Sequence, residues 1–499
     1  MKRTGDKLLV ANRGEIAIRI FRACREMGIS TVAVYSDADR DSLHVGYADE
    51  ARRIGPAPAR ESYLSVERIL DAAKRSGAGM VHPGYGFLAE NAVFARACRD
   101  AGLTFVGPPP EAVEAMGSKT ESRRRMIEAG VPVVPGMSRA AAPDDVVAFG
   151  REAGYPILLK ASAGGGGKGM RVVAAEGEVA SAFERAASEA QAFFGDPAVY
   201  AEKLVDGARH VEVQIVFDGE GRGVAVGERE CSIQRRHQKV VEECPSPAVD
   251  PSLRAALGAA ALAAARAVGY VSCGTVEFLL DRDGKFYFLE MNTRLQVEHA
   301  ITEEVWGVDL VREMISIARG EPLSFSAAEL SPRGHAIECR IYAEDPDRQF
   351  APSPGRIEFL SLPQGPGVRH DIGVETGSVV PIDYDPMLGK LIATGRSRAE
   401  AIARLGRALS EYEVVGIKTS LPFFRELVGD PDFLAGSFDT GWLDRRLARG
   451  ASPAPVDPDD DVVALAAAVL ARSEEKRFAA PRRGRISAWR DAARRGALR

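Results

Sequence analysis

The chain has 499 residues, of which 45% are hydrophobic and 27% charged; this composition is typical of a globular protein with a large core, and the length suggests about three domains. A formal net charge of −5 argues against nucleic acid as the main partner, so we expect any anion site to be local. No apolar run approaches the roughly 18–20 residues of a membrane span, and the first residues, MKRTGDKLLVANRG, contain no signal-peptide core.

The N-terminal region predicts an open α/β sheet. Residues 8–36 read as strand, turn, helix and strand, because apolar residues recur at helical spacing before the β-branched run at 31–35. The alternation continues to about residue 110. Only Gly14 follows the first strand, so the GxGxxG of a dinucleotide fold is missing and a nicotinamide cofactor is not expected. The segment HPGYGFLAEN at 82–91 fits either a plain Gly/Pro connection or a site loop.

A glycine-rich loop follows in the second region. Gly164, Gly166 and Gly169 formally satisfy GxGxxG within ASAGGGGKGM, but the flanking YPILLK and MRVV are both strand-like. A Rossmann loop would open a helix, so we expect a hairpin flap that closes over a nucleoside triphosphate. Walker A is excluded because glycine, not serine or threonine, follows Lys168. Glycines let backbone N–H groups approach phosphate oxygens, and Lys160 and Lys168 add positive charge.

Polar side chains dominate residues 210–239. His210, Glu212 and Gln214 alternate with apolar residues, which predicts a half-buried strand that enters a turn at 218–223. The polar run beyond the turn fits a solvated loop or a pocket wall, and apolar strands on both sides favour the wall. Its members are Glu228, Glu230, Gln234, Arg235, Arg236, His237, Gln238 and Lys239.

An acidic hairpin completes the set. In FLEMNTRLQVEH (288–299), an extended strand would place five polar side chains on one face: Glu290, Asn292, Arg294, Gln296 and Glu298. A solvent-exposed strand edge would explain such a segment in isolation. However, GTVEFLL at 274–280 brings Glu277 across the turn at 281–284. Paired carboxylates suit a hard cation such as Mg²⁺ bound together with substrate phosphates.

Together these motifs resemble a known family. VANRGEIA, HPGYGFL.EN, the glycine-rich loop, CS.QRRHQK, EMN.R.QVEH and GHA.ECR.YAEDP occur in the order and spacing of the biotin carboxylases of the ATP-grasp superfamily. The resemblance covers about residues 5–447 and implies an N-terminal α/β domain at 1–114 and an ATP-grasp domain at 115–330 with a mobile lid at about 135–203. It further implies a β-rich C-terminal domain at 331–447, followed by a linker and basic tail at 448–499.

The same resemblance implies roles for single residues. ATP would be bound at its phosphates by Lys119, Lys160, Gly166 and Gly167, at its adenine by Glu202, Lys203, Leu204 and Val205, and at its ribose by His210, Gln234 and His237. Mg²⁺ (or Mn²⁺) would be held by Glu277, Glu290 and Asn292, and bicarbonate by Lys239, Arg294, Gln296 and Val297. Glu298 would be the base and Arg340 would face the biotin ureido oxygen. Ala163 and Ala89 depart from the family pattern without removing a needed contact.

The implied activity is that of an ATP-dependent ligase. Bicarbonate must lose a proton to attack the γ-phosphate, so the reaction needs a carboxylate base beside cations, and the resulting carboxyphosphate needs protection from water. Another ATP-grasp ligase is disfavoured by the QVEH and GHAIECR segments. A non-catalytic nucleotide-binding regulatory subunit would be expected to lack Glu298, Arg340 or the metal carboxylates, and all are present.

Partners follow from the same reading. The sequence contains no AMKM biotin-acceptor motif, so we expect no covalent biotin on this chain and transfer to biotin on a separate carrier protein. That would be the first half-reaction of an acyl-CoA carboxylase such as the acetyl-CoA carboxylase of fatty acid biosynthesis. A carboxyltransferase would choose the final acceptor, whether acetyl-CoA, propionyl-CoA, another acyl-CoA or pyruvate. We also expect a homodimer and, from six cysteines without CxxC spacing, a cytoplasmic protein. The tail at 448–499 fits a solvated segment or a docking element.

Overall fold

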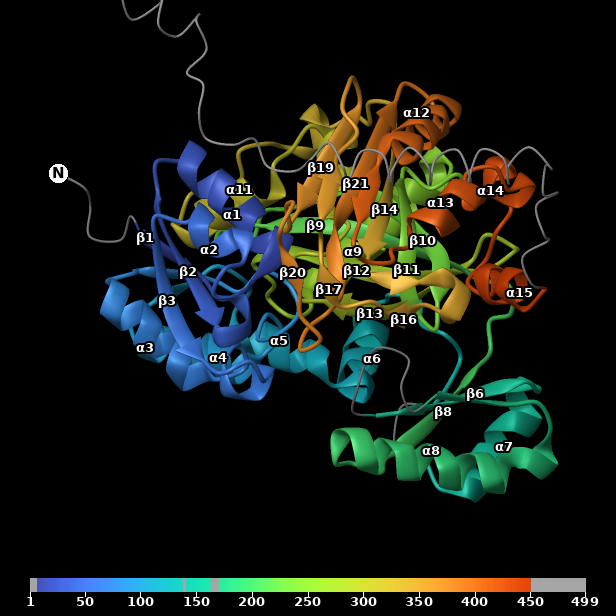
Figure 1. Cartoon of the computed structure of the whole chain (residues 1–499). Helices are drawn as coiled ribbons and strands as arrows, with labels where there is room; N and C mark the ends of the chain where they lie inside the picture. The colour runs from blue at the N-terminus through green and yellow to red at the C-terminus, as the bar shows by residue number, and fades with distance from the viewer. Residues whose placement is uncertain (1–6, 138–140, 163–169, 450–499) are drawn as a thin grey trace, which may run out of the picture. The chain divides into compact units, whose positions relative to one another are not determined.

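The computed structural model describes residues 7–137, 141–162 and 170–449 (Figure 1). The glycine-rich loop, including Gly166 and Gly167, and the tail from residue 450 lie outside the described residues. The described residues up to Asp444 belong to one compact unit. None of the helices in the described ranges combines the length and the apolar character that a membrane crossing requires.

A five-stranded parallel sheet of order β3-β2-β1-β4-β5 forms the N-terminal region. Its strands are β1 (Lys7–Val10), β2 (Ser30–Ser36), β3 (Glu50–Gly55), β4 (Met80–His82) and β5 (Thr104–Phe105). Its helices are α1 (Gly14–Glu26), α2 (Leu43–Tyr47), α3 (Val66–Ser76) and α4 (Ala92–Asp100). The predicted strand, turn, helix and strand at 8–36 are therefore confirmed.

Both faces of this sheet are covered, as in other parallel sheets. Leu8 packs with Ile20 of α1 on one face, and Leu9 packs with Ile69 of α3 on the other. The connection after β4 ends at Asn91, whose side chain accepts a hydrogen bond from the Phe94 N–H at 2.8 Å and so starts α4. This cap fixes where the HPGYGFLAEN segment returns to the helical layer.

A small antiparallel sheet of order β7-β6-β8 carries the strands that flank the glycine-rich loop. The strands are β6 (Ile157–Ala161), β7 (Met170–Val173) and β8 (Val199–Lys203). Helices α7 (Pro143–Ala153) and α8 (Val179–Phe194) pack against them, and α5 (Pro110–Gly117) and α6 (Lys119–Glu128) precede this sheet in the chain. Lys160 pairs with Met170 across β6 and β7. The prediction that two strands, rather than a strand and a helix, flank the loop is therefore confirmed.

An eight-stranded antiparallel sheet of order β13-β12-β9-β10-β11-β14-β21-β19 forms the largest layer (Figure 1). Its strands are β9 (Arg209–Phe217), β10 (Gly223–Arg235), β11 (Gln238–Cys244), β12 (Ser272–Leu280), β13 (Phe286–Asn292), β14 (His335–Tyr342), β19 (Val368–Ile372) and β21 (Met387–Gly395). Because β11 pairs directly with β14, the hydrogen-bonded ladder is continuous from the acidic hairpin to the C-terminal region.

Helices cover the large sheet. They are α9 (Pro251–Arg266), α10 (His299–Trp306), α11 (Leu310–Ala318), α12 (Arg398–Glu411), α13 (Leu421–Leu427) and α14 (Pro431–Ala435). Helix α15 (Trp442–Ala448) begins with Trp442 and Leu443, which are buried in the same core as α12 and α13. Short strands complete the C-terminal region: β15 (Glu344–Asp345), β16 (Ala351–Pro352), β17 (Gly355–Arg356), β18 (Phe359–Ser361), β20 (Val379–Val380) and β22 (Glu413–Val415). Short 3₁₀ helices lie at Asp37–Asp39, Ala59–Glu61, Glu176–Glu178, Ala327–Glu329 and Pro346–Arg348.

Two local predictions need correction. Strand β9 is not half-buried: Val213 and Ile215 pack under α9 on one face, and Glu212 and Gln214 are 0% exposed on the other. The segment 288–299 is not one extended strand either, because β13 ends at Asn292 and α10 begins at His299. Helix α9 covers one face of β9, and the side chains of Arg229 and Lys239 cover Glu212 on the other. Residues 293–298 form an irregular turn instead of continuing the ladder.

Candidate active site

A cavity of about 740 Å³ lies where the N-terminal region, the small sheet and the large sheet contribute side chains. It is lined by most of the residues that the sequence singled out. These are Lys119, Lys160, His210, Gln234, His237, Lys239, Glu277, Glu290, Asn292, Arg294, Gln296, Val297 and Arg340. The chain therefore gathers groups from widely separated sequence positions around one space.

The acidic hairpin presents its carboxylates as predicted. Glu277 of β12 lies directly opposite Glu290 of β13 in the antiparallel register. Glu277 accepts hydrogen bonds from Asn292 Nδ2 at 2.8 Å and from Gln296 Nε2 at 3.2 Å. Burial raises the pKa of Glu290, and the charge of Glu277 raises it further. A site where two carboxylates repel each other beside an amide oxygen fits a hard divalent cation.

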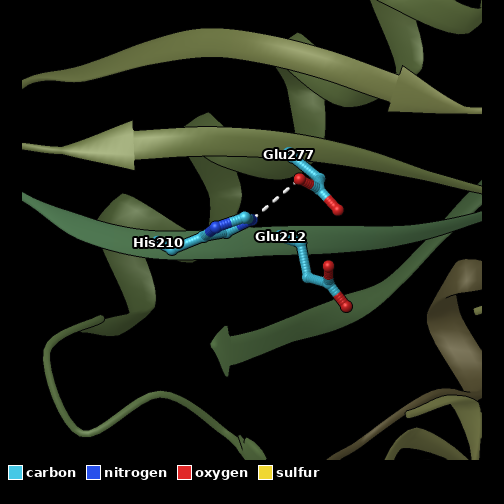
Figure 2. Close-up of side chains that lie close together, drawn as sticks. All are labelled: His210, Glu212 and Glu277. Atoms are coloured by element: carbon cyan, nitrogen blue, oxygen red, sulfur yellow. Dashed lines mark ion pairs between the residues drawn. The ribbon is translucent and has the colours of Figure 1, made fainter. Parts of the chain in front are cut away.

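His210 and Glu212 of β9 lie beside Glu277 of the neighbouring strand β12 (Figure 2). His210 Nε2 lies 2.9 Å from Glu277 Oε2, and Gln234 Nε2 lies 2.7 Å from His210 Nδ1. Burial lowers the pKa of His210, but the attraction of Glu277 outweighs it and leaves that pKa above the ordinary value. These groups are close enough to hold a metal ion, but Lys239 already lies between the two carboxylates.

Lys239 is the central cation of the site. Its Nζ donates to Glu212 at 2.5 Å, to Glu277 at 2.8 Å and to Glu298 at 2.8 Å. Burial lowers the pKa of Lys239, yet the surrounding carboxylates hold it well above the usual range. The ammonium therefore stays charged at neutral pH and balances these three carboxylates.

Glu298 lies immediately behind the cavity lining at the start of α10. It is 0% exposed. One of its oxygens accepts from Lys239, and the other lies 3.0 Å from Arg340 Nη2. Burial raises the pKa of Glu298, but these two cations hold it well below the usual range. Glu298 is thus an ionised carboxylate clamped between two cations, next to the side chains predicted to bind an anion.

Arg340 has a second carboxylate partner that the sequence did not point to. Its Nε donates to Glu242 Oε1 at 2.7 Å, and both side chains are buried. Burial raises the pKa of Glu242 to about 7, although Arg340 opposes the shift. Arg340 of β14 and Glu242 of β11 lie on neighbouring strands, a pairing that no local motif reveals.

Arg294 is fixed from three sides. Its guanidinium donates to Asn292 Oδ1 at 3.0 Å, to Gln296 Oε1 at 2.8 Å and to Glu90 Oε2 at 2.8 Å. Glu90 belongs to HPGYGFLAEN, and it also accepts from the Thr293 N–H at 3.0 Å. The segment is therefore a site loop that orients the 293–296 turn, and not a plain connection. The HPGYGFLAEN motif was the sequence signal that could have identified Glu90.

The hinge residues predicted for adenine do not line the cavity. The carboxylate of Glu202 accepts from Lys160 Nζ at 2.5 Å and from Arg123 Nη1 at 3.1 Å. Lys203 Nζ donates to the Gly154 carbonyl at 2.7 Å. Leu204 and Val205 follow β8 directly. Glu202 and Lys203 therefore end the strand that pairs with the strand of Lys160, and of these residues only Lys160 reaches the cavity.

The polar run 228–239 divides between two environments. Gln234, His237, Gln238 and Lys239 line the cavity. His237 sits in the two-residue turn between β10 and β11 with a positive φ of 64°, as hairpin turns require. By contrast Glu228 pairs with Arg254 at 2.6 Å, away from the cavity. The interpretation as a pocket wall therefore holds for the end of the run only.

Arg229, which the sequence did not single out, lies behind the residues that line the cavity. It is 0% exposed, and its guanidinium contacts Glu212 at 2.5 Å, Gln214 at 2.7 Å and Thr302 at 2.9 Å. Glu212 thus joins Arg229 to Lys239. The buried ion pair between Arg229 and Glu212 therefore fixes the carboxylate that accepts from Lys239.

Three family models match the chain. They describe the biotin carboxylase N-terminal domain (residues 4–113), the ATP-binding domain of the carbamoyl-phosphate synthase L chain (residues 118–326) and the biotin carboxylase C-terminal domain (residues 338–445).

Among curated proteins, the biotin carboxylase of Halalkalibacterium halodurans is 53% identical over 442 residues, which cover 88% of this chain and 98% of that protein. One subunit of the pyruvate carboxylase of Methanothermobacter thermautotrophicus is 51% identical over 441 residues, which cover 88% and 89%. Among solved structures, the biotin carboxylase domain dimer of Hydrogenobacter thermophilus 2-oxoglutarate carboxylase, in complex with MgADP, ADP and bicarbonate, has a TM-score of 0.85 at 45% identity. That match covers 89% of this chain and 98% of the solved chain.

Proposed function

The chain belongs to the biotin carboxylase family, and from this premise we propose which of its residues carry the reaction and which partner receives the product. As a biotin carboxylase it is an ATP-dependent ligase that uses Mg²⁺ and bicarbonate. Its fold is that of the family: an N-terminal parallel α/β sheet, an ATP-grasp region and a C-terminal region rich in strands.

The observation that carries the proposal is the position of Glu298 between Lys239 and Arg340. Bicarbonate is a poor nucleophile until it loses its proton. We assign that proton to the Glu298 carboxylate, which two cations keep ionised. Lys239, Arg294, Gln296 and the backbone of Val297 then hold the anion while one of its oxygens attacks the γ-phosphate.

At the nucleotide end, Lys119 and Lys160 are assigned to the ATP phosphates as point charges. Glu277, Glu290 and Asn292 would hold Mg²⁺, which supplies charge neutralisation for phosphoryl transfer. Lys119 Nζ lies 3.9 Å from Glu290 Oε2, so a phosphate and a cation would meet at the same end of the cavity.

We assign the rest of the nucleotide to the residues that the family resemblance names. Glu202, Lys203, Leu204 and Val205 are assigned to adenine, and His210, Gln234 and His237 to the ribose. Residues 135–203 with Gly166 and Gly167 are assigned to a lid that would exclude water from carboxyphosphate.

At the other end, Arg340 is assigned to the biotin ureido oxygen. A guanidinium remains charged and offers directed donors, so it can stabilise the negative charge that develops on this oxygen when the ring nitrogen gives its proton to the phosphate released, together with CO₂, from carboxyphosphate. The buried Glu242 holds the guanidinium from behind. The orientation of Arg340 is therefore set before biotin enters.

We propose that the biotin is attached to a separate carrier protein, and that a carboxyltransferase passes the carboxyl group to its final acceptor. Similar relatives bear names with different acceptors, pyruvate and 2-oxoglutarate, which supports a choice of acceptor outside this catalytic region. A homodimer is part of the proposal and is supported by the dimer of the solved relative. A cytoplasmic location is supported by six unpaired, buried cysteines.

The test is ADP release by the purified chain with ATP, Mg²⁺, bicarbonate and either free biotin or a biotinylated carrier. Release that needs both bicarbonate and biotin is expected. ATP binding without such turnover would favour a regulatory subunit, and turnover with ammonia or a purine intermediate instead of biotin would favour another ATP-grasp ligase. A streptavidin blot of the chain co-expressed with a biotin ligase should be blank, and a band at its mass would contradict the separate carrier.

A further inference from the structure

Lys390 is a buried lysine to which the proposed reaction assigns no role. It lies in β21 directly opposite Arg340 of β14, and it is 2% exposed. Its side chain does not line the cavity. Taking an ammonium group out of water is costly unless it is paired, so its partners should explain why a lysine stands there.

One partner is a backbone group of the active site. Lys390 Nζ donates to the carbonyl oxygen of Val297 at 2.6 Å. This carbonyl belongs to the peptide that joins Val297 to Glu298. The hydrogen bond therefore fixes the backbone immediately before the proposed base.

This backbone needs such support. Strand β13 ends at Asn292 and α10 starts at His299, so the ladder of the sheet does not extend through the turn. The side chain of Glu298 is held at its far end by Lys239 and Arg340. Lys390 supplies the matching restraint at the backbone end.

The other neighbours of Lys390 are anions. Its Nζ lies 3.4 Å from Glu15 Oε1 and 3.7 Å from Asp371 Oδ2. Burial lowers the pKa of Lys390, but Glu15 and the nearby Glu338 outweigh it and keep the group charged. Glu338 is 0% exposed, and neither of its oxygens has a hydrogen-bond partner among the described residues. The charge of Lys390 is thus balanced by Glu15 and Asp371, and the side chain does not line the cavity.

A link to the opposite wall of the cavity completes the arrangement. Tyr85, which lines the cavity, donates its hydroxyl hydrogen to Glu15 Oε1, the oxygen that faces Lys390. Lys390 therefore ties together the loop after β4, the start of α1 and the turn before α10.

We propose that Lys390 is a positioning residue, which fixes the peptide between Val297 and Glu298 and thereby aims the Glu298 carboxylate at the anion site. This inference rests on the proposed role of Glu298. It assigns no contact with substrate to Lys390. It predicts that losing the ammonium group harms the bicarbonate-dependent step and spares ATP binding.

The experiment compares four variants by their kcat and by separate KM values for bicarbonate and ATP. Lys390→Met removes the donor, and Lys390→Arg keeps a charged donor. Lys390→Met/Asp371→Asn removes one buried charge of each sign, so that the core stays balanced: burial raises the pKa of Asp371, but Arg369 and Lys390 hold it below its usual range. Lys418→Met is the matched control, because Lys418 is exposed.

For Lys390→Met and the double variant we expect kcat/KM for bicarbonate to fall on the order of 10–100-fold, as small misplacements of catalytic groups do, with KM for ATP within about 2-fold of wild type. Lys390→Arg should recover part of this loss, and Lys418→Met should behave as wild type. Amide hydrogen exchange at residues 294–298 should become faster in the double variant.

Normal bicarbonate kinetics in a folded double variant would overturn the proposal. An equal loss of kcat/KM for ATP and for bicarbonate, with no recovery in Lys390→Arg, would also overturn it, because that pattern indicates a purely structural lysine. Bicarbonate-dependent turnover of the wild type, and its loss in Glu298→Gln, test the proposed function separately. The inference about Lys390 can therefore fail while the proposed function stands.

Discussion

The ammonium of Lys239 lies 2.8 Å from Oε1 of Glu298, and this contact helps to keep the proposed base ionised before bicarbonate binds. A carboxylate that is paired with a cation stays ionised at neutral pH and can accept the proton of bicarbonate. Because the same ammonium also contacts Glu212 and Glu277, the acidic hairpin and the base share one counter-charge.

Replacing the base tests this arrangement. Glu298→Gln keeps the shape of the side chain but replaces one of the two acceptor oxygens with an amide donor, and it cannot accept a proton as a carboxylate does. We expect biotin carboxylation to fall by about 10²–10⁴-fold, the usual contribution of a general base, while ATP still binds. The measurement is bicarbonate-dependent ADP release together with nucleotide binding by calorimetry. Near-normal turnover would contradict the assignment, and the exposed Glu358→Gln serves as the control.

The metal assignment is tested on the hairpin. Glu290→Ala removes one of the two opposed carboxylates and should prevent productive binding of Mg·ATP with little loss of fold. Activity should fall sharply at ordinary Mg²⁺ and recover in part at high Mg²⁺, and chelation should abolish wild-type turnover. Asp283→Ala in the turn of the same hairpin removes an exposed carboxylate and should leave activity intact. Full bicarbonate-dependent ATPase in Glu290→Ala would mean that the carboxylates are structural.

The buried Arg229 makes a prediction about stability. Arg229→Met leaves Glu212 as a buried carboxylate that has lost one of its two cations, and removing one partner of a buried pair costs about 3–5 kcal/mol. We expect the free energy of unfolding in urea to fall by this order. Arg407→Met breaks an exposed pair with Glu411 and should change it little. If the two variants are equally stable, the buried network is not what holds Glu212.

A buried histidine predicts a pH dependence. Burial lowers the pKa of His82 to about 3, against about 6.5 in an unfolded chain. Its stabilising contribution is therefore present above about pH 6.5 and lost as the pH falls, because the unfolded chain takes up a proton that the folded one does not. The limiting slope is about 1.4 kcal/mol per pH unit.

The measurement is the apparent Tm between about pH 6.5 and 4.5. The wild type should lose stability faster than His82→Gln, in which the side chain can still accept from the Gly84 N–H, as His82 Nδ1 does at 3.0 Å. Parallel curves would contradict the prediction. His44→Gln is a useful comparison, because burial also lowers the pKa of His44, to about 4.

Local patterns predicted the parts of the fold that depend on neighbouring residues. The first strand and helix, the strands on both sides of the glycine-rich loop and the acidic hairpin all follow from spacing and turn residues. The end of β13 did not follow, because no glycine or proline marks Asn292 as the last residue of the strand. Glu298 consequently reaches the site from the start of a helix instead of from the strand.

The residues that the sequence missed are those whose roles depend on strand order. Glu242, Arg229 and Lys390 acquire their partners only when β11, β10 and β21 take their places in the sheet. Nothing in a sequence window shows which strand will lie next to it. The burial of both faces of β9 was missed for the same reason, since α9 and Arg229 come from other parts of the chain.

The continuous ladder of the large sheet also restricts how this chain can vary in length. Side chains alternate between the two faces of a strand, so deleting or inserting one residue within β12 or β14 would turn every following side chain of that strand to the opposite face. Glu277 and Arg340 would then point away from the cavity. Tolerated length changes should therefore collect in turns such as 218–222 and 281–285, and homologous chains should align through these strands without gaps.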